Sequence, residues 1–318
     1  MSFASDVRGE LARIPCTDSC CARSELTAAL LASGGISYCG RNRYLMAITA
    51  ADAPVVRRFF GMLKQFWGII GQIRTVTTDS LNGQTRYQLV VPPEASLPLL
   101  KALLLWDDSA LFGVRQTPDP EVVRFACCKK AFVRASFLMC GAISNPEKEY
   151  HIEIAAPTES FAEFIIELMN YFEINVKSTC RKSKYMVYLK RSEDISDMLT
   201  LLGASGAVLA FENIRVKKDV SNRVNRQMNC DQSNIDRVVD AAEAQIRDIA
   251  YIDQELGMDK LPKSLREMAE VRVNHPETSL SGLGELLVPP IGKSGVSARL
   301  RRIADIAQKL RSGEDIHL

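Results

Sequence analysis

The feature that most constrains the fold of this 318-residue chain is an internal repeat. The segment ELTAALLASGGIS, from residue 25 to 37, matches VRASFLMCGAIS, from residue 133 to 144, when Gly34 is aligned with Gly141. Each copy continues with an alternating strand, a turn of small residues or proline, an amphipathic helix and a further strand. The two halves therefore predict the same unit of helices and strands, a tandemly duplicated α+β domain.

The opening helix of each copy has small residues four positions apart. These are Ala29 and Ser33 in the first copy, and Ser136 and Cys140 in the second. Small side chains at this spacing let two helix backbones approach closely. We expect the two helices to pair across a pseudo-twofold axis, with an antiparallel sheet curving away on each side. The alternative, in which each helix packs only on its own sheet, stays open at this point.

The N-terminal 14 residues predict an amphipathic helix with Ser5 as its N-cap. This segment lacks the apolar stretch of a signal peptide, and no segment reaches the roughly 18 consecutive apolar residues of a membrane span. We therefore expect a cytoplasmic protein that makes no membrane contact. In that compartment cysteine thiols stay reduced.

The cysteines are unusual because their number, nine, is odd and two pairs are adjacent, at positions 20–21 and 127–128. Cys16 and Cys20 have the i, i+4 spacing of a helix and Cys39 follows, a set compatible with zinc. The paired CxxC motifs of a strong zinc signature are missing. Side chains of adjacent residues also point apart on a helix or strand. The pattern favours reduced core thiols, with no metal and no cofactor.

The C-terminal part predicts a bundle of helices. Apolar residues at spacings of three and four indicate a helix over 234–256, capped by Ser233 and ended by Gly257. The next helix begins at Pro262 and ends near residue 274, because the residue before a proline disfavours helix. Its expected core face comprises Leu265, Met268, Ala269 and Val273.

A short helix, a break and a longer basic helix then follow. Ser279 is the expected cap of a helix over 280–287, residues 288–292 interrupt it, and the last helix spans 293–310. This order is typical of a helix-turn-helix, whose second helix enters the major groove of DNA. The expected DNA contacts on the last helix are Lys293, Ser294, Ser297, Arg299, Arg301 and Arg302. Ser294, Ser297 and Arg299 are expected in the groove, and Arg301 and Arg302 at phosphates or in solvent.

The net charge of +2 excludes a uniformly polycationic protein, but the basic residues are unevenly placed. The composition of residues 209–230 predicts an exposed basic linker. Its candidate DNA contacts are Lys217, Lys218, Arg223 and Arg226. The alternative is a solvated connector without a partner.

The paired helices resemble the LAGLIDADG motif of homing endonucleases. Residues 27–35 and 134–142 take its nine positions. In that family the penultimate residue of each copy is an acid that holds the catalytic divalent metal, but here these positions are Gly34 and Gly141. A glycine offers no oxygen ligand, so the resemblance implies a degenerate site that is not an enzyme. Three acids occur nearby, Glu25, Asp52 and Glu147, but the motif does not place them in that site.

The whole chain resembles the WhiA family of bacterial transcriptional regulators. The resemblance rests on the SF…GELARI start, both degenerate motifs, the segment over 213–242 and the segment over 261–303. It implies a degenerate LAGLIDADG-like domain at 1–208, with half-repeats at about 1–115 and 120–208, a basic linker at 209–230 and a helix-turn-helix domain at 231–318.

The function that this resemblance implies is sequence-specific DNA binding at promoters, linked to sporulation and cell division, by a monomer near the nucleoid. A further expected partner is another transcription factor or RNA polymerase. Two alternatives stay open: a metal-dependent endonuclease of LAGLIDADG type, and a protein-docking scaffold in which DNA binding is secondary.

Overall fold

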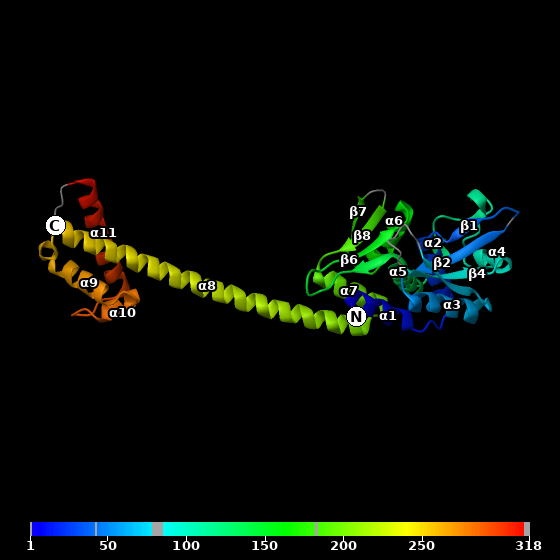
Figure 1. Cartoon of the computed structure of the whole chain (residues 1–318), viewed down its shortest axis with the longest axis horizontal. Helices are drawn as coiled ribbons and strands as arrows, with labels where there is room; N and C mark the ends of the chain where they lie inside the picture. Colours follow the sequence, from blue (N-terminus) through cyan, green and yellow to red (C-terminus); the bar gives the residue numbers. More distant parts are fainter. Residues whose placement is uncertain (1, 42, 78–84, 182–183, 315–318) are drawn as a thin grey trace. The chain divides into compact units, whose positions relative to one another are not determined.

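The computed structural model describes residues 2–41, 43–77, 85–181 and 184–314. It divides into two compact units, Met1–Lys218 and Asp219–Leu318 (Figure 1). One long helix, α8 (Ser205–Glu255), contributes residues to both units. No helix within the described ranges combines the length and the apolar character needed to cross a membrane.

The first unit contains the same arrangement of elements twice. The first copy consists of α1 (Phe3–Arg13), α2 (Ser19–Ser33), β1 (Ile36–Tyr38), β2 (Tyr44–Ala50), α3 (Ala53–Trp67), β3 (Gln72–Thr77), β4 (Thr85–Val91) and α4 (Pro93–Ala102). The second consists of α5 (Ala126–Cys140), β5 (Gly141–Ile143), β6 (Ile152–Ala156), α6 (Glu159–Tyr171), β7 (Lys177–Arg181), β8 (Lys184–Leu189) and α7 (Ser192–Leu202). Two short 3₁₀ turns, Leu111–Gly113 and Pro120–Val123, lie between them.

The two sheets have the same topology, which confirms the predicted duplication. Their strand orders are β1-β2-β4-β3 and β5-β6-β8-β7, and all neighbouring strands are antiparallel. One face of each sheet is buried beneath helices: Ile48 lies opposite Leu89 in the first sheet, and Ile152 lies opposite Leu189 in the second. Alternating residues such as Met46 and Ile48 of β2 face the core, whereas the other face carries polar residues together with some apolar ones, such as the exposed Leu45.

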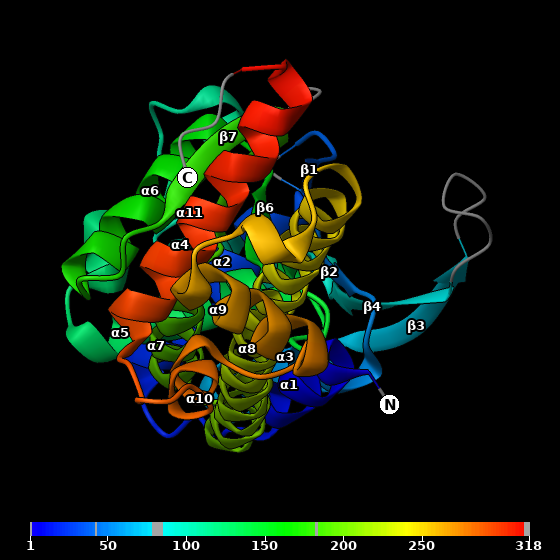
Figure 2. The ribbon, with the colours of Figure 1, turned by 90° about the vertical axis from the view of Figure 1, so that its left-hand side faces the viewer.

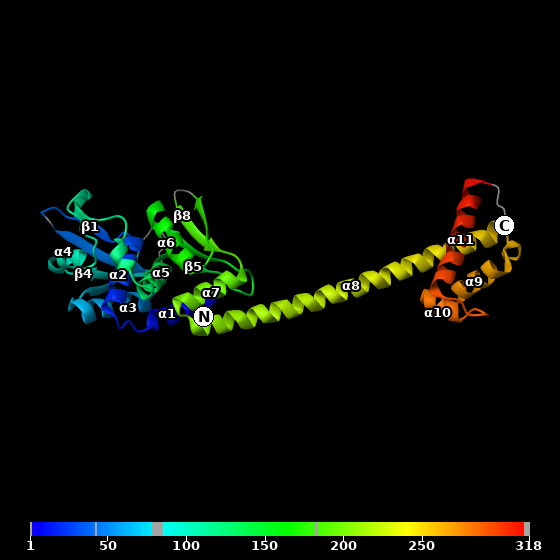
Figure 3. The ribbon, with the colours of Figure 1, turned by 180° about the vertical axis from the view of Figure 1, so that it is seen from behind.

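Helices α2 and α5 form the centre of the first unit and pack on each other, as predicted (Figure 3). Ala29 and Ser136 are fully buried. The Ser24 hydroxyl donates a hydrogen bond of 2.7 Å to the Cys128 carbonyl on the other helix. Small side chains therefore permit the close approach of the two backbones.

The N-cap of α1 differs from the prediction. Ser2 precedes the helix and its hydroxyl accepts a hydrogen bond from the Ser5 N–H, so Ser5 lies inside the first turn. The predicted Ser5 cap is wrong because the helix begins at Phe3, two residues before Ser5.

The second unit is helical, with a core of its own. Helices α9 (Lys263–Asn274), α10 (Leu280–Glu285) and α11 (Lys293–Ser312) follow the 3₁₀ turn Met258–Lys260, and α11 packs on both α9 and α10 (Figure 2). The buried core includes Ile249 and Ile252 of α8 together with Leu265, Met268, Leu283, Val296, Leu300 and Ile303.

Two expectations for this unit are wrong. The helix expected over 234–256 is the last part of α8, so Ser233 is an interior residue and not a cap. Val273 is 45% exposed, whereas the neighbouring Arg272 is buried. Arg272 donates a hydrogen bond of 2.9 Å to the Thr278 carbonyl, and burial lowers its pKa. Its side chain thereby holds the loop after α9.

Candidate nucleic-acid interface

The segment between α10 and α11 positions the last helix. Ser279 caps α10 by accepting a hydrogen bond from the Gly282 N–H, as predicted. Residues 286–292 join the two helices, a longer connection than the turn of about three or four residues in most helix-turn-helix units. The Ile291 N–H bonds the Gly284 carbonyl at 3.0 Å, and a Cβ on Gly284 would lie 2.2 Å from the Ile291 carbonyl oxygen. Glycine therefore lets this connection fold tightly against α10.

The N-terminal end of α11 presents polar groups to solvent. Gly292 is the N-cap and contributes no side chain, while Lys293 and Ser294 are exposed and Ser297 is half-buried. Because the first backbone N–H groups of a helix lack intrahelical partners, this end is suited to bind an anion. The opposite face of α11 is anchored in the core by Val296 and Leu300.

The three arginines of α11 differ in their surroundings. Arg301 and Arg302 are exposed. Arg299 is half-buried and its Nη1 donates to the Ser264 carbonyl at 3.4 Å, so it also contacts α9. The structure thus gathers all six candidate residues on one helix, with Arg299 already in an intramolecular contact.

The basic segment expected as a linker is helical. Lys217, Arg223 and Arg226 are exposed on α8. Lys218 is half-buried, and its Nζ lies 4.7 Å from the centre of the Tyr150 ring, a cation–π contact. Lys217 and Lys218 belong to the first unit, and Arg223 and Arg226 to the second.

The degenerate motif ends supply no carboxylate. Gly34 terminates α2 with a φ of +60°. Gly141 follows α5, and a Cβ there would lie 2.3 Å from Phe137 Cδ2 and 2.5 Å from the Phe137 carbonyl oxygen. The second position therefore has no room for an acidic side chain.

The three nearby acids serve other contacts. Glu25 is fully buried and binds Arg58 and Arg134, Asp52 accepts a hydrogen bond of 2.7 Å from Arg8, and Glu147 is exposed. None of these three lines the cavity beside Gly34, whose described lining contains Tyr38, Phe112 and Arg115 but no acidic residue. The contacts of Glu25 and Asp52 give these two acids structural roles.

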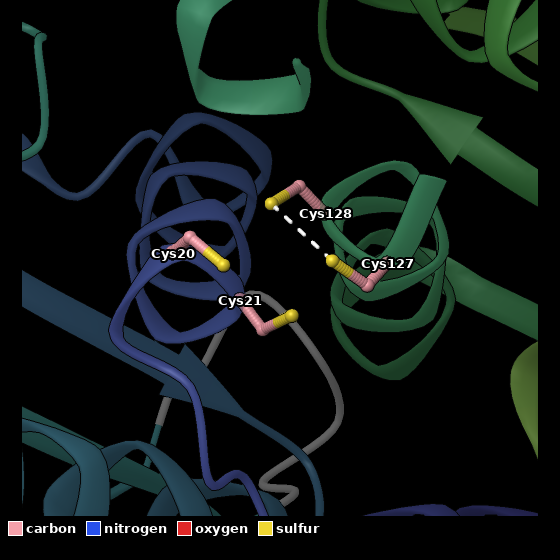
Figure 4. Close-up of side chains that lie close together, drawn as sticks. All are labelled: Cys20, Cys21, Cys127 and Cys128. Atoms are coloured by element: carbon pink, nitrogen blue, oxygen red, sulfur yellow. Dashed lines mark hydrogen bonds between the residues drawn. The ribbon is translucent and has the colours of Figure 1, made fainter. Parts of the chain in front are cut away.

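Four cysteines meet at the N-terminal ends of α2 and α5. The Sγ atoms of Cys20, Cys21, Cys127 and Cys128 all lie within 4.8 Å of one another (Figure 4). Burial raises the pKa of the Cys128 thiol to about 12, whereas hydrogen bonds from neighbouring thiols outweigh burial and lower the pKa of Cys127. The expectation that adjacent cysteines point apart is wrong for this pair, since Cys127 Sγ and Cys128 Sγ are 3.9 Å apart.

The set considered from the sequence, Cys16, Cys20 and Cys39, does not come together. Cys16 Sγ contacts the Asp18 carbonyl and Cys39 Sγ the Ser37 carbonyl. The signal that would have found the observed cluster is the repeat register, because aligning Gly34 with Gly141 also aligns Cys20 with Cys127 and Cys21 with Cys128.

Comparisons with known proteins identify the family. Residues 19–106 match the WhiA N-terminal LAGLIDADG-like domain, residues 129–221 the WhiA LAGLIDADG-like domain, and residues 224–307 the WhiA C-terminal HTH domain. A protein of Desulforamulus reducens, named probable cell division protein WhiA, is 37% identical over 100% of this chain and 98% of its own length. The chain belongs to the WhiA family.

Other WhiA proteins agree with this assignment. The probable cell division protein WhiA of Thermoanaerobacter pseudethanolicus is 39% identical, over 98% of both chains. The crystal structure of full-length DUF199/WhiA from Thermotoga maritima has the same fold, with a TM-score of 0.58 at 22% identity over 97% of this chain and 99% of that one. A duplicated LAGLIDADG-like domain followed by a helix-turn-helix is thus the architecture of this WhiA protein.

Proposed function

We propose that this WhiA protein is a sequence-specific DNA-binding regulator of transcription that acts in cell division and sporulation and does not cleave DNA. The observation that supports it most directly is α11, whose N-terminal end exposes Lys293 and Ser294 beside uncapped backbone N–H groups. The names of its relatives support the link to cell division. Its site of action is the promoter DNA of the nucleoid, where other transcription factors or RNA polymerase are its further partners.

In this proposal α11 is the recognition helix. Lys293, Ser294 and Ser297 face base edges or the phosphates beside them, and Arg301 and Arg302 bind the backbone. Arg299 links α11 to α9 through Ser264 and thereby holds the angle of the helix.

The absence of nuclease activity rests on Gly34 and Gly141. Neither position offers an oxygen ligand for a divalent metal, and Gly141 lacks space for a side chain. We expect pure protein to leave plasmid DNA intact in Mg²⁺ or Mn²⁺. Cleavage that copurifies with the protein and that a chelator abolishes would contradict this part of the proposal.

The DNA-binding proposal is tested by selecting bound fragments from a genomic library and deriving their common sequence. Lys293→Ala and Arg301→Ala should then weaken binding to that sequence by roughly 1–3 kcal/mol for each lost specific contact, and less for a phosphate contact alone. The matched control is Lys309→Ala, which removes the same charge from the exposed surface of the same helix about 24 Å away.

Three results would contradict the proposal: no common sequence among bound fragments, equal effects of Lys293→Ala and Lys309→Ala, or no effect of either. Arg299→Ala is a poor first variant because the loss of its bond to Ser264 would alter the helix packing as well.

A further inference from the structure

The four clustered cysteines occupy equivalent positions in the two halves of the duplicated domain. Helix α2 begins at Ser19 and α5 at Ala126, so each cysteine pair takes the second and third residues of its helix. Figure 4 shows the two pairs facing each other across the α2–α5 interface. Two adjacent cysteines on one helix are a poor chelate by themselves, but the pseudo-twofold pairing of the helices supplies four sulfurs from two directions.

The spacing of these sulfurs fits a single metal ion. In a tetrahedral tetrathiolate site with metal–sulfur bonds of about 2.3 Å, the sulfurs stand about 3.8 Å apart. Here all four Sγ atoms lie within 4.8 Å of one another, and Cys127 and Cys128 are at 3.9 Å. Small rotations of the side chains would complete the tetrahedron.

Other uses of four thiols fit less well. A disulfide requires a sulfur–sulfur distance near 2.05 Å, and adjacent cysteines at 3.9 Å are not bonded. The four thiolates of an iron–sulfur cluster are divided among two or four iron atoms, so at least some of them stand farther apart than the ligands of one ion. A tetrahedral S₄ set around a single ion is the arrangement that Zn²⁺ prefers in structural sites.

The ends of the two helices also suit the charge of such a site. Four thiolates around a divalent cation have a net charge of −2, and a helix N-terminus stabilises negative charge. Neither N-cap, Asp18 nor Phe125, makes a side-chain hydrogen bond to its first turn. The backbone N–H groups at both ends are thus free of side-chain caps and can compensate the charge.

The cluster is reachable from solvent. Cys127 is exposed, Cys20 and Cys21 are half-buried, and Cys128 is buried. An ion can therefore enter without unfolding of the paired helices. With all four positions taken by protein ligands, no open coordination position is left for a reacting molecule, so the site is structural.

We propose that Cys20, Cys21, Cys127 and Cys128 bind one Zn²⁺ ion that joins α2 to α5 and so links the two halves of the duplicated domain. The ion lies at the N-terminal ends of the paired helices, whereas Gly34 and Gly141 lie at their C-terminal ends. The zinc site is therefore separate from the position where a LAGLIDADG nuclease holds its catalytic metals.

The first test is the metal content of the full-length protein, purified under reducing conditions without a metal-affinity step and measured by elemental analysis and native mass spectrometry. We expect about one zinc per chain, lost in Cys21→Ser/Cys128→Ser. The control is Cys230→Ser, which removes an exposed thiol on α8 and should retain the ion. Iron at the same stoichiometry, bound sulfide or a disulfide within the cluster would overturn the assignment.

The second test begins with the wild-type protein, and its spectroscopic part needs no variant. Wild-type protein stripped of metal and reconstituted with Co²⁺ should show the intense visible bands of tetrahedral cobalt together with sulfur-to-cobalt charge transfer. Zinc should then displace the cobalt and abolish the colour, and chelation should lower the Tm of the wild type but not that of Cys21→Ser/Cys128→Ser. Wild-type protein that binds neither ion at stoichiometric level would overturn the proposal.

Discussion

Among the described residues, Glu25 is the acidic side chain with no exposed surface, and its surroundings account for its burial. Its two carboxylate oxygens accept hydrogen bonds of 2.7 Å from Nε and Nη2 of Arg58 on α3. A third donor, Arg134 Nη1 on α5, lies at 3.1 Å. One carboxylate thus joins three helices, because two guanidinium groups compensate its charge in a place that water does not reach.

Removing the charge of Glu25 should therefore destabilise the folded protein. We expect Glu25→Gln to lower the free energy of unfolding by roughly 3–5 kcal/mol, since it leaves the buried guanidinium of Arg58 and the half-buried one of Arg134 without their counterion. Urea denaturation followed by circular dichroism measures this. The control is Asp52→Asn, which breaks the half-exposed pair with Arg8 and should cost less than about 1 kcal/mol. Equal losses in the two variants would contradict the structural role of Glu25.

Two neighbouring glycines at the end of α2 are required for different reasons. Gly34 has a φ of +60° and open space around its Cβ position, whereas a Cβ on Gly35 would lie 1.7 Å from the Ala47 carbonyl oxygen of β2. We expect Gly34→Asn to cost less than about 1 kcal/mol, because asparagine tolerates the left-handed region. Gly35→Ala must displace β2 and should cost several times more. Thermal denaturation of both variants checks this, and a larger effect of Gly34→Asn would contradict it.

At the level of elements, α8 has a long stretch without tertiary burial. Every residue from 219 to 241 is exposed. Side-chain bonds along the helix, such as Gln232 to Asp236 at 2.7 Å, stabilise it only by a few tenths of a kcal/mol each. Most helical stability in proteins comes from tertiary packing, so this stretch has little of it.

We expect the amides of residues 221–241 to exchange with solvent at least about a hundredfold faster than those of α2, which is buried along most of its length. Hydrogen exchange read by mass spectrometry measures both segments in one sample. Protection of 221–241 equal to that of α2 would contradict this expectation and would show that another molecule covers the stretch.

The sequence correctly predicted the elements for which the spacing of apolar residues and the residues at the helix ends indicate the same boundaries. The α10 cap at Ser279 and the start of α11 at Lys293 were identified because a cap residue and two prolines mark them. The length of α8 was missed because its basic segment, which also contains Ser and Asn, was interpreted as a linker, although the sequence has no Gly or Pro between Gly206 and Gly257. The burial of Arg272 was not predicted because the helical period is compatible with either Arg272 or Val273 facing the core. In the structure Arg272 faces inward, where it donates a hydrogen bond to the Thr278 carbonyl of the next loop.

At the scale of the molecule, the duplication explains why motif spacing within single segments of the sequence did not predict the cysteine cluster. Cys20–Cys21 and Cys127–Cys128 have no shared motif spacing along the chain. They become neighbours only through the pairing of α2 with α5, which the sequence predicted from small residues and symmetry. A site formed across a pseudo-twofold axis needs only half of its ligands in each copy, so neither copy contains the complete motif.

Two separate hydrophobic cores predict two unfolding transitions. One core runs from Val7 to Phe211 and the other from Ile249 to Ala307. Leu300→Ala should destabilise the second core by roughly 2–5 kcal/mol and lower only its transition, while Glu25→Gln should lower only that of the first. Differential scanning calorimetry resolves the two, and zinc removal should shift only the first, because all four cysteines belong to that unit. A single transition that moves as a whole in each variant would contradict independent cores, since cooperativity would then extend through α8.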